Sequence, residues 1–125
     1  MTDINPSERS DLIDTLLWVM RGWGLDGKQQ IRLLGLPDRI PARSLQQYAQ
    51  GKAIPDETAF LQHAELILAI YRAVSSFFPG NTTMANYWVT TPSSPFGGST
   101  PLDIMLTDGL DGMRYCLDHL NGEHW

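Results

Sequence analysis

Residues 56–78 read DETAFLQHAELILAIYRAVSSFF, and their apolar members recur at the spacing of an α-helix. One apolar stripe contains Phe60, Ala64, Ile67, Leu68, Tyr71, Val74 and Phe78, and a second contains Leu66, Ile70, Ala73 and Phe77. A helix that is apolar on two faces is buried between two layers. At 1.5 Å per residue, this segment spans on the order of 35 Å. We therefore predict a central helix, ended by Pro79, that is shared by both halves of the fold.

Three shorter helices are predicted before the central one. Asn5 supplies a capping side chain and Pro6 suits the first turn of a helix that ends at 22–24. A second helix is expected over about 27–34 and a third over about 41–50, each closed by a glycine.

The helical pattern continues after the central segment. Thr82 or Thr83 is expected to cap a fifth helix, and Thr100 to cap a sixth. Gly109 separates the sixth helix from a seventh over about 111–120.

Period-two alternation of apolar and polar residues is sustained nowhere, so the sequence predicts an all-α fold of about seven helices. We divide it into a helix-turn-helix-like region over 1–55, the central helix over 56–79 and a C-terminal helical region over 80–125.

The composition is that of a single globular domain. The chain has 125 residues, 42% of them hydrophobic, and a net charge of −5. The one cysteine, Cys116, cannot form an intrachain disulfide, which fits a reducing cytoplasm. The polar segment 1–11 does not resemble a signal peptide, and the apolar run 66–71 is too short to span a membrane. We expect a cytoplasmic protein without membrane association.

Charge is distributed unevenly along the chain. Residues 28–52 contain five basic side chains and one acidic one, whereas residues 70–125 contain two basic and five acidic ones. The first segment suits a nucleic acid and the second does not. A basic solvated face without a partner is the alternative.

The second and third helices have the outline of a helix-turn-helix, with a three- to six-residue turn between them. Side chains of the types that read base edges or grip phosphates lie on and around the third helix. The DNA-binding candidates are Arg39, Arg43, Ser44, Gln46, Gln47 and Lys52. Helical proteins that never touch DNA share this outline, so a purely structural role stays open.

Catalytic chemistry has little support. His63, His119 and His124 are each expected to be isolated surface histidines, and Cys116 to be an inert inward-facing thiol. There is no phosphate loop and no zinc-ligand spacing. We predict no catalytic residues, no metal and no cofactor. A small enzyme that uses His119 and Cys116 is a remote alternative.

Trp125 follows the polar run 121–124 and is the last residue of the sequence. An aromatic side chain in this position either folds back on the body of the protein or docks into a partner.

Several motifs resemble the toxin-binding domain of the Xre, MbcA and ParS antitoxins. They are Trp88-Val89-Thr90-Thr91-Pro92, Phe96-Gly97-Gly98-Ser99-Thr100-Pro101-Leu102-Asp103, Met105-Leu106 and Gly109. Upstream, the residues that resemble the Xre-type helix-turn-helix region and the helix after it are Trp23-Gly24-Leu25, Leu33-Leu34-Gly35 and Ile70-Tyr71-Arg72-Ala73. The resemblance covers about residues 10–122.

The resemblance implies an antitoxin that neutralises a cognate toxin, commonly of the NAD-consuming RES class, and that represses its own operon together with the toxin. The N-terminal half would bind operator DNA and dimerise, and the C-terminal half would cap the toxin and block its active site. Partners are therefore the toxin and DNA, within a homodimer or a toxin–antitoxin hetero-oligomer. The toxin-binding candidates are Trp88, Pro92, Phe96, Gly97, Gly98, Pro101, Leu102, His124 and Trp125.

Two alternatives stay open. Trp88 and Leu102 can be core residues, and Gly97-Gly98 only a tight turn. The protein as a whole can be a stand-alone helix-turn-helix transcriptional regulator that has no toxin.

Overall fold

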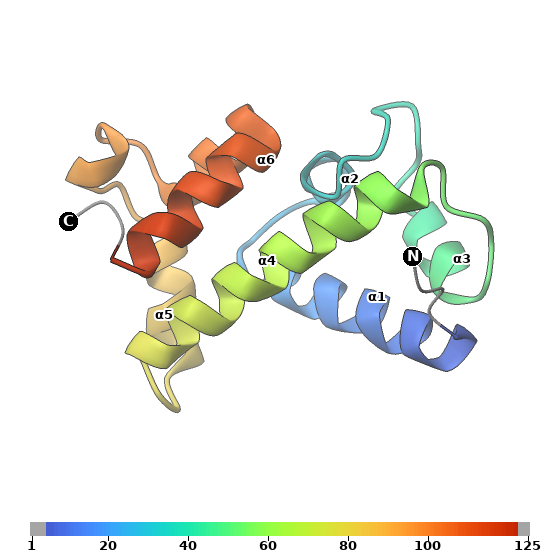
Figure 1. Cartoon of the computed structure of the whole chain (residues 1–125), viewed down its shortest axis with the longest axis horizontal. Helices are drawn as coiled ribbons and strands as arrows, with labels where there is room; N and C mark the ends of the chain where they lie inside the picture. The colour runs from blue at the N-terminus through green and yellow to red at the C-terminus, as the bar shows by residue number, and fades with distance from the viewer. Residues whose placement is uncertain (1–4, 123–125) are drawn as a thin grey trace.

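A long central helix crosses the molecule and separates two groups of shorter helices in the computed structural model, which describes residues 5–122 (Figure 1). In chain order the elements are α1 (Pro6–Gly22), α2 (Gly27–Leu33), α3 (Ser44–Ala49), α4 (Glu57–Phe77), α5 (Thr82–Val89), the 3₁₀ helix η1 (Ser94–Phe96) and α6 (Pro101–Leu120). No strand occurs among residues 5–122, so the predicted all-α fold is confirmed.

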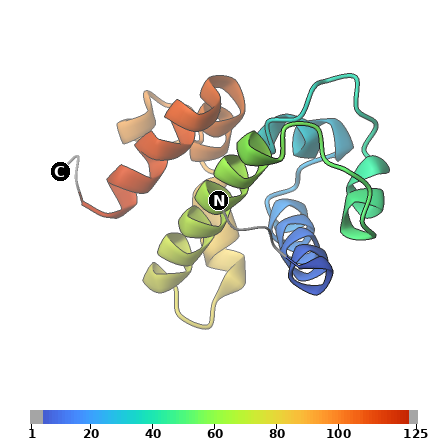
Figure 2. The same ribbon diagram turned by 45° about the vertical axis from the view of Figure 1, so that its right-hand side comes forward.

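The central position of α4 confirms the two-layer prediction. It packs against α1 on one side and against α5 and α6 on the other, an arrangement visible after a 45° turn (Figure 2). The buried side chains of α4 are Phe60, Ala64, Ile67, Ile70 and Val74. Phe77 was placed on the second apolar stripe, but its side chain is 58% exposed. The burial of α4 therefore stops about one turn before the helix ends.

Side-chain caps fix most helix starts. Asn5 caps α1 as predicted, accepting a hydrogen bond from the Glu8 N–H at 2.8 Å. Thr100 caps α6 in the same way, accepting from the Asp103 N–H at 2.9 Å. The prediction that Thr82 or Thr83 caps α5 is wrong, because Asn81 accepts the Met84 N–H at 3.1 Å.

Two other boundaries differ from the prediction. Residues 41–43 form a turn, in which the Ser44 N–H donates to the Pro41 carbonyl at 2.9 Å, so α3 begins three residues later than expected. Gly109 has non-helical dihedral angles (φ 60°, ψ −132°), but helical hydrogen bonding resumes at once, so one kinked α6 replaces the predicted sixth and seventh helices.

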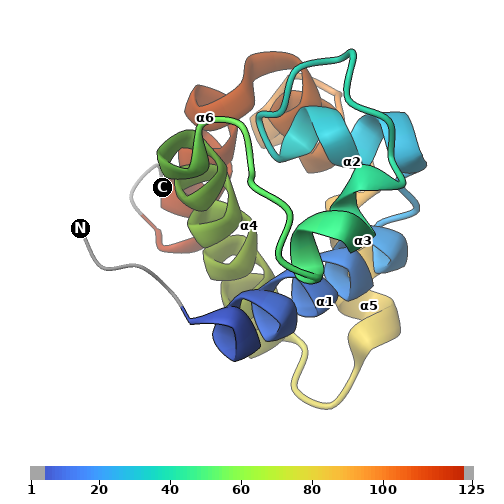
Figure 3. The ribbon, with the colours of Figure 1, turned by 90° about the vertical axis from the view of Figure 1, so that its right-hand side faces the viewer.

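The two groups of helices also meet away from α4. The short α2 packs against α6, whereas α3 packs against α1 (Figure 3). Ile31, Leu33 and Leu34 are buried, as predicted for the inner face of the second helix. No helix among the described residues combines the length and apolarity needed to cross a membrane.

Candidate functional site

The segment between α5 and α6, residues 90–100, folds into a closed loop. The Ser93 N–H donates to the Ser99 carbonyl at 3.1 Å, and the Gly98 N–H donates back to the Ser93 carbonyl at 3.2 Å. A further bond from the Ser99 N–H to the Phe96 carbonyl, at 3.0 Å, completes the ring of backbone contacts. Because these bonds satisfy the loop's own backbone groups, it holds its shape with the single turn of η1 as its regular structure.

Phe96 anchors this loop to the helices beneath it. Its side chain is only 4% exposed. Its ring meets three others edge to face, with centroid distances of 6.0 Å to Trp88, 5.4 Å to Tyr115 and 5.3 Å to His119. The Tyr115 hydroxyl also donates to the Pro95 carbonyl at 2.7 Å. Edge-to-face rings at these distances attract one another beyond their burial, so the cluster fixes the loop against α6.

The structure sorts the C-terminal candidate residues by exposure. Pro92, Gly97 and Gly98 are exposed on the loop, and Trp88 is half-buried beside it. The remaining described candidates, Phe96, Pro101 and Leu102, are buried. These three therefore support the loop from below and present no contact surface of their own. His124 and Trp125 lie outside the described residues.

The two glycines of the loop adopt left-handed backbone conformations, with φ of +65° at Gly97 and +85° at Gly98. A Cβ at either position would meet no atom within 4 Å. The positive φ values therefore explain why glycine occupies both positions, and a lack of space for a side chain does not. The loop consequently presents bare backbone at the glycines to solvent, together with Pro92, Ser94 and Pro95.

Tyr115 and His119 are parts of the loop's support that sequence reasoning missed. His119 was expected to be an isolated surface histidine, and this is wrong because it is 7% exposed and stacks against Phe96. His63 is half-buried as well, with Nδ1 2.7 Å from the Ala59 carbonyl oxygen. The one available signal was the spacing of Tyr115 and His119, which places both on one face of a helix.

Cys116 lies in the interior, as predicted, with its Sγ 3.6 Å from the Pro101 carbonyl oxygen. Burial raises the pKa of this thiol from 9.0 to about 12, because desolvation penalises the thiolate. At neutral pH the side chain is therefore a protonated, apolar core group and offers no nucleophile.

Residues 73–123 match the family model of the antitoxin Xre/MbcA/ParS C-terminal toxin-binding domain. Over this stretch the chain is similar to the toxin-binding domains of that antitoxin family. The match begins inside α4 and includes α5, the whole closed loop and α6. No curated protein matches the chain.

The basic segment, residues 28–52, lies on the other side of α4 from the closed loop (Figure 1). Arg39, Arg43, Gln46, Gln47 and Lys52 have exposed side chains, and the Lys52 ammonium donates to the Gln47 side-chain oxygen at 3.0 Å. Ser44 differs from the other candidates because it is 3% exposed. It packs beneath the surface that the others form, so it is not available to contact DNA in this conformation.

The helix pair differs from the predicted helix-turn-helix outline. Ten residues, 34–43, separate α2 from α3, where a turn of three to six residues was expected. Residues 41–43, which form a turn, are three of the four residues by which the connection exceeds the upper limit of that expectation. The helix α3 itself is six residues long. α3 nevertheless presents a polar outer face above its buried Leu45 and Tyr48.

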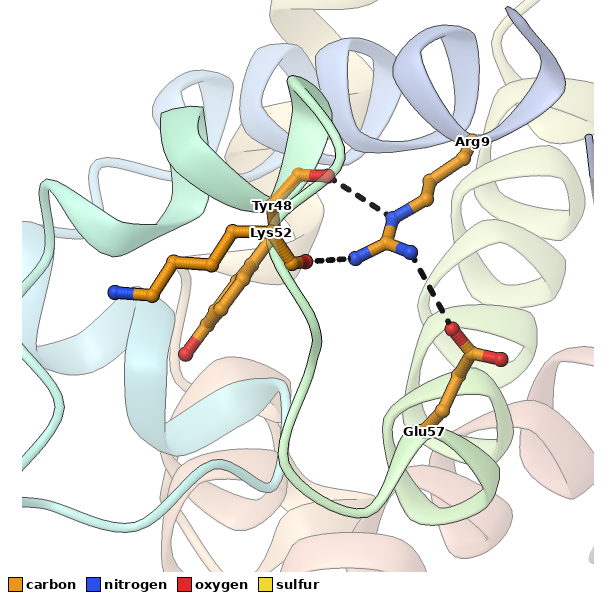
Figure 4. A network of polar contacts seen from close by, with 4 residues as sticks. All are labelled: Arg9, Tyr48, Lys52 and Glu57. Atoms are coloured by element: carbon orange, nitrogen blue, oxygen red, sulfur yellow. Dashed lines mark hydrogen bonds and ion pairs between the residues drawn. The ribbon is translucent and has the colours of Figure 1, made fainter. Parts of the chain in front are cut away.

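Arg9 holds the basic segment in place (Figure 4). Its Nε donates to the Tyr48 carbonyl at 2.9 Å, and its Nη2 donates to the Lys52 carbonyl. Its Nη1 lies 3.6 Å from a carboxylate oxygen of Glu57. One guanidinium thus joins α1 to the end of α3 and the start of α4. No local pattern identified this residue, because its partners are about 40 residues away in the sequence.

Proposed function

We propose that this antitoxin neutralises a cognate toxin of the NAD-consuming RES class by covering its active site. The observation that supports this most is the match to a toxin-binding domain over residues 73–123, the stretch that contains the closed loop. We assign direct contact to the outer surface of that loop, namely Pro92, Gly97 and Gly98, with Trp88 at its edge. His124 and Trp125 are proposed to reach into the toxin's cleft.

A preformed loop suits this role. Binding orders little additional chain if the surface already has its bound shape, and this reduces the entropic cost of association. The backbone ring of residues 93–99 and the aromatic cluster around Phe96 hold the loop in one conformation. Phe96, Pro101 and Leu102 serve as its supports and do not touch the toxin.

The acidic character of the C-terminal half supports a basic partner. Asp108 and Asp111 line a groove of about 530 Å³ together with Phe96, Ile104 and Tyr115. A toxin cleft that binds a dinucleotide must attract phosphate groups and is therefore expected to be basic. Opposite potentials on the two proteins would steer association and favour this partner over others.

We further propose that the exposed basic segment binds operator DNA as a homodimer, or within a toxin–antitoxin hetero-oligomer, and so represses the operon. The contact residues are Arg39, Arg43, Gln46, Gln47 and Lys52. Two copies of a six-residue α3 would read two half-sites, as dimeric helix-turn-helix proteins do. Cytoplasmic localisation follows from this role. A stand-alone regulator remains the competing proposal.

The test is co-expression of the chain with the protein encoded beside it. Size-exclusion chromatography, growth and cellular NAD are then measured. A stable complex with growth restored and NAD preserved is expected. No complex, with growth unaffected by the neighbouring protein, would leave the stand-alone regulator as the better proposal.

A matched pair of variants locates the contact. Pro92→Arg places a cation on the closed loop, whereas Pro37→Arg places the same charge on an exposed proline in the other half. Against a basic cleft, we expect the first variant to lose tenfold or more in toxin affinity and the second to retain it. Equal affinity for both would move the toxin contact away from the loop.

A further inference from the structure

An apolar cavity of about 190 Å³ opens where the C-terminal ends of α4 and α6 meet α5. Five of its six lining side chains are hydrophobic, and the full lining consists of Val74, Phe77, Phe78, Trp88, His119 and Leu120. Phe77 is 58% exposed, and Phe78 and Trp88 are half-buried, so aromatic side chains reach the solvent at the rim of the cavity. Exposed apolar surface around a cavity marks a place where a binding partner can bury an apolar group.

The cavity and the closed loop share a wall. Trp88 and His119 line the cavity, and their rings also meet Phe96, the anchor of the loop, at centroid distances of 6.0 and 5.3 Å. All six lining residues fall within residues 73–123, the stretch that matches a toxin-binding domain. A partner that contacts the loop beside Trp88 therefore lies next to the opening of the cavity.

Charge favours a different protein over a second copy of this chain as the occupant. Residues 70–122 contain two basic and four acidic side chains. Two of the acidic ones, Asp108 and Asp111, line the groove that also contains Phe96. A second copy that docked through the same face would bring its own carboxylates to this surface, and like charges oppose association. A partner with a basic surface is attracted there instead.

The size and lining of the cavity suit one aromatic ring. An apolar cavity of about 150 Å³ in another protein accommodates benzene. The 190 Å³ found here is therefore large enough for an aromatic side chain, which Phe77, Phe78 and Trp88 can contact edge to face. Aromatic side chains buried in a pocket of the partner are among the residues that contribute most to protein–protein binding.

We propose that this cavity receives an aromatic side chain of the toxin, which anchors the toxin beside the closed loop. The inference rests on the proposed function and adds to it the place and the chemistry of one contact. The buried Val74 and Leu120 form the inner wall, whereas Phe77 stands at the rim. Because Phe77 is mostly exposed, its side chain can be removed with little loss from the folded core.

A matched pair of variants of the full chain tests the contact. Toxin affinity is measured by isothermal titration calorimetry for the parent protein, Phe77→Ala and Tyr87→Ala. Phe77→Ala is expected to lose about tenfold or more, because it opens the wall around the anchor, and Tyr87→Ala less than about threefold. Tyr87 is the control because it is 60% exposed and lies in the same matched stretch, but is not among the lining residues.

Each outcome separates this inference from the proposed function. Equal losses in the two variants, or unchanged affinity in Phe77→Ala, would overturn the cavity contact and leave toxin binding itself established. A parent chain that binds no toxin would overturn the proposed function, and this inference with it.

Methyl NMR identifies the occupant directly. In a complex of the ¹³C-methyl-labelled chain with unlabelled toxin, the methyl groups of Val74 and Leu120 should show intermolecular NOEs to aromatic protons. Those of Leu16, a fully buried residue of α1, should show none. NOEs to aliphatic protons alone, or no NOEs, would contradict an aromatic anchor. The same NOEs in a mixture of labelled and unlabelled chain without toxin would assign the cavity to a second copy and overturn the proposal.

Discussion

Two loops of similar length, residues 34–43 and residues 90–100, are held in different ways. In the first, each backbone bond connects close neighbours, as from the Ile40 N–H to the Pro37 carbonyl at 3.0 Å. In the second, the Ser93 N–H reaches the Ser99 carbonyl, and the buried Phe96 joins the loop to α6. The first loop is a chain of short turns whose buried residues, Leu34 and Leu36, lie at its start, whereas the second closes on itself around the buried Phe96.

The difference matches what each loop presents to solvent. Residues 34–43 carry exposed charges, including Arg39 and Arg43, whose long side chains can adjust to a charged partner. The exposed residues of 90–100 all have short side chains or none: Thr90, Pro92, Ser94, Pro95, Gly97 and Gly98. Under the proposed function, a partner would recognise this loop by the shape of its fixed backbone and the basic segment by its charge.

The largest effect is expected for Phe96→Ala, which removes the anchor of the closed loop. Deleting a buried aromatic side chain costs about 3–5 kcal/mol of unfolding free energy, and toxin binding should be lost even where the protein remains folded. Urea unfolding and a pull-down with the toxin measure the two effects. Tyr87→Ala, which removes an exposed ring from the neighbouring α5, should change stability by about 0.5 kcal/mol or less. Similar losses in both variants would contradict an anchoring role.

Arg9 supports the N-terminal half, which carries the basic segment. Arg9→Met keeps the apolar stem but removes hydrogen bonds from a charged donor to the carbonyls of Tyr48 and Lys52, a loss of about 1.5–3 kcal/mol. Operator affinity should fall with stability, and toxin affinity should not. Arg114→Met, whose pairing with Asp111 is largely exposed, is the control and should be close to neutral. If Arg9→Met left the free energy of unfolding unchanged, Arg9 would not be the support of this half.

Salt dependence distinguishes the two surfaces directly. Operator binding should weaken steeply as salt rises, and Arg43→Ala should cost about 1–3 kcal/mol if Arg43 reads a base. Arg114→Ala removes the same charge from the C-terminal half and should leave operator affinity unchanged. Fluorescence anisotropy with operator DNA at several salt concentrations is the measurement. Unchanged affinity for Arg43→Ala would exclude this residue from the DNA contact.

The effect that is smallest near neutral pH concerns the buried thiol of Cys116, because it develops only above pH 9. The pKa of Cys116 is 9.0 when unfolded and about 12 in the folded protein, so above pH 9 only the unfolded chain loses this proton. The unfolded state then binds fewer protons, and the unfolding free energy falls by up to about 1.4 kcal/mol per pH unit between pH 9 and 12. Cys116→Ala should show a correspondingly shallower pH slope in urea unfolding. Identical slopes would mean that the thiol reaches water.

Local patterns predicted most of the helices. Asn5 and Thr100 were identifiable as caps because capping depends on a side chain and a backbone N–H three residues away. The burial of α4 followed from the spacing of its apolar residues. The start of α3 was misplaced, since a proline near a helix start is equally compatible with the turn that precedes Ser44.

The supports of both candidate surfaces could not be predicted, since they join residues far apart in the chain. Tyr115 meets the Pro95 carbonyl across 20 residues, and Arg9 meets the Lys52 carbonyl across 43. The local periodicity of apolar and polar residues gives no sign of such long-range pairings. The motif around Phe96 made this loop a candidate but did not show which of its residues face inward. Burial of Phe96 and His119 follows only from the packing of the loop on α6.

The central position of α4 limits recombination between genes that encode proteins of this fold. Because one helix contributes side chains to the cores of both halves, a crossover within it would join two incompatible half-cores. The contact between α2 and α6 adds a second constraint on any exchange. Substitutions in residues 90–100 therefore disturb the shared core less than exchange of the whole C-terminal half would. The two candidate surfaces can change independently, but the segments that carry them are inherited together.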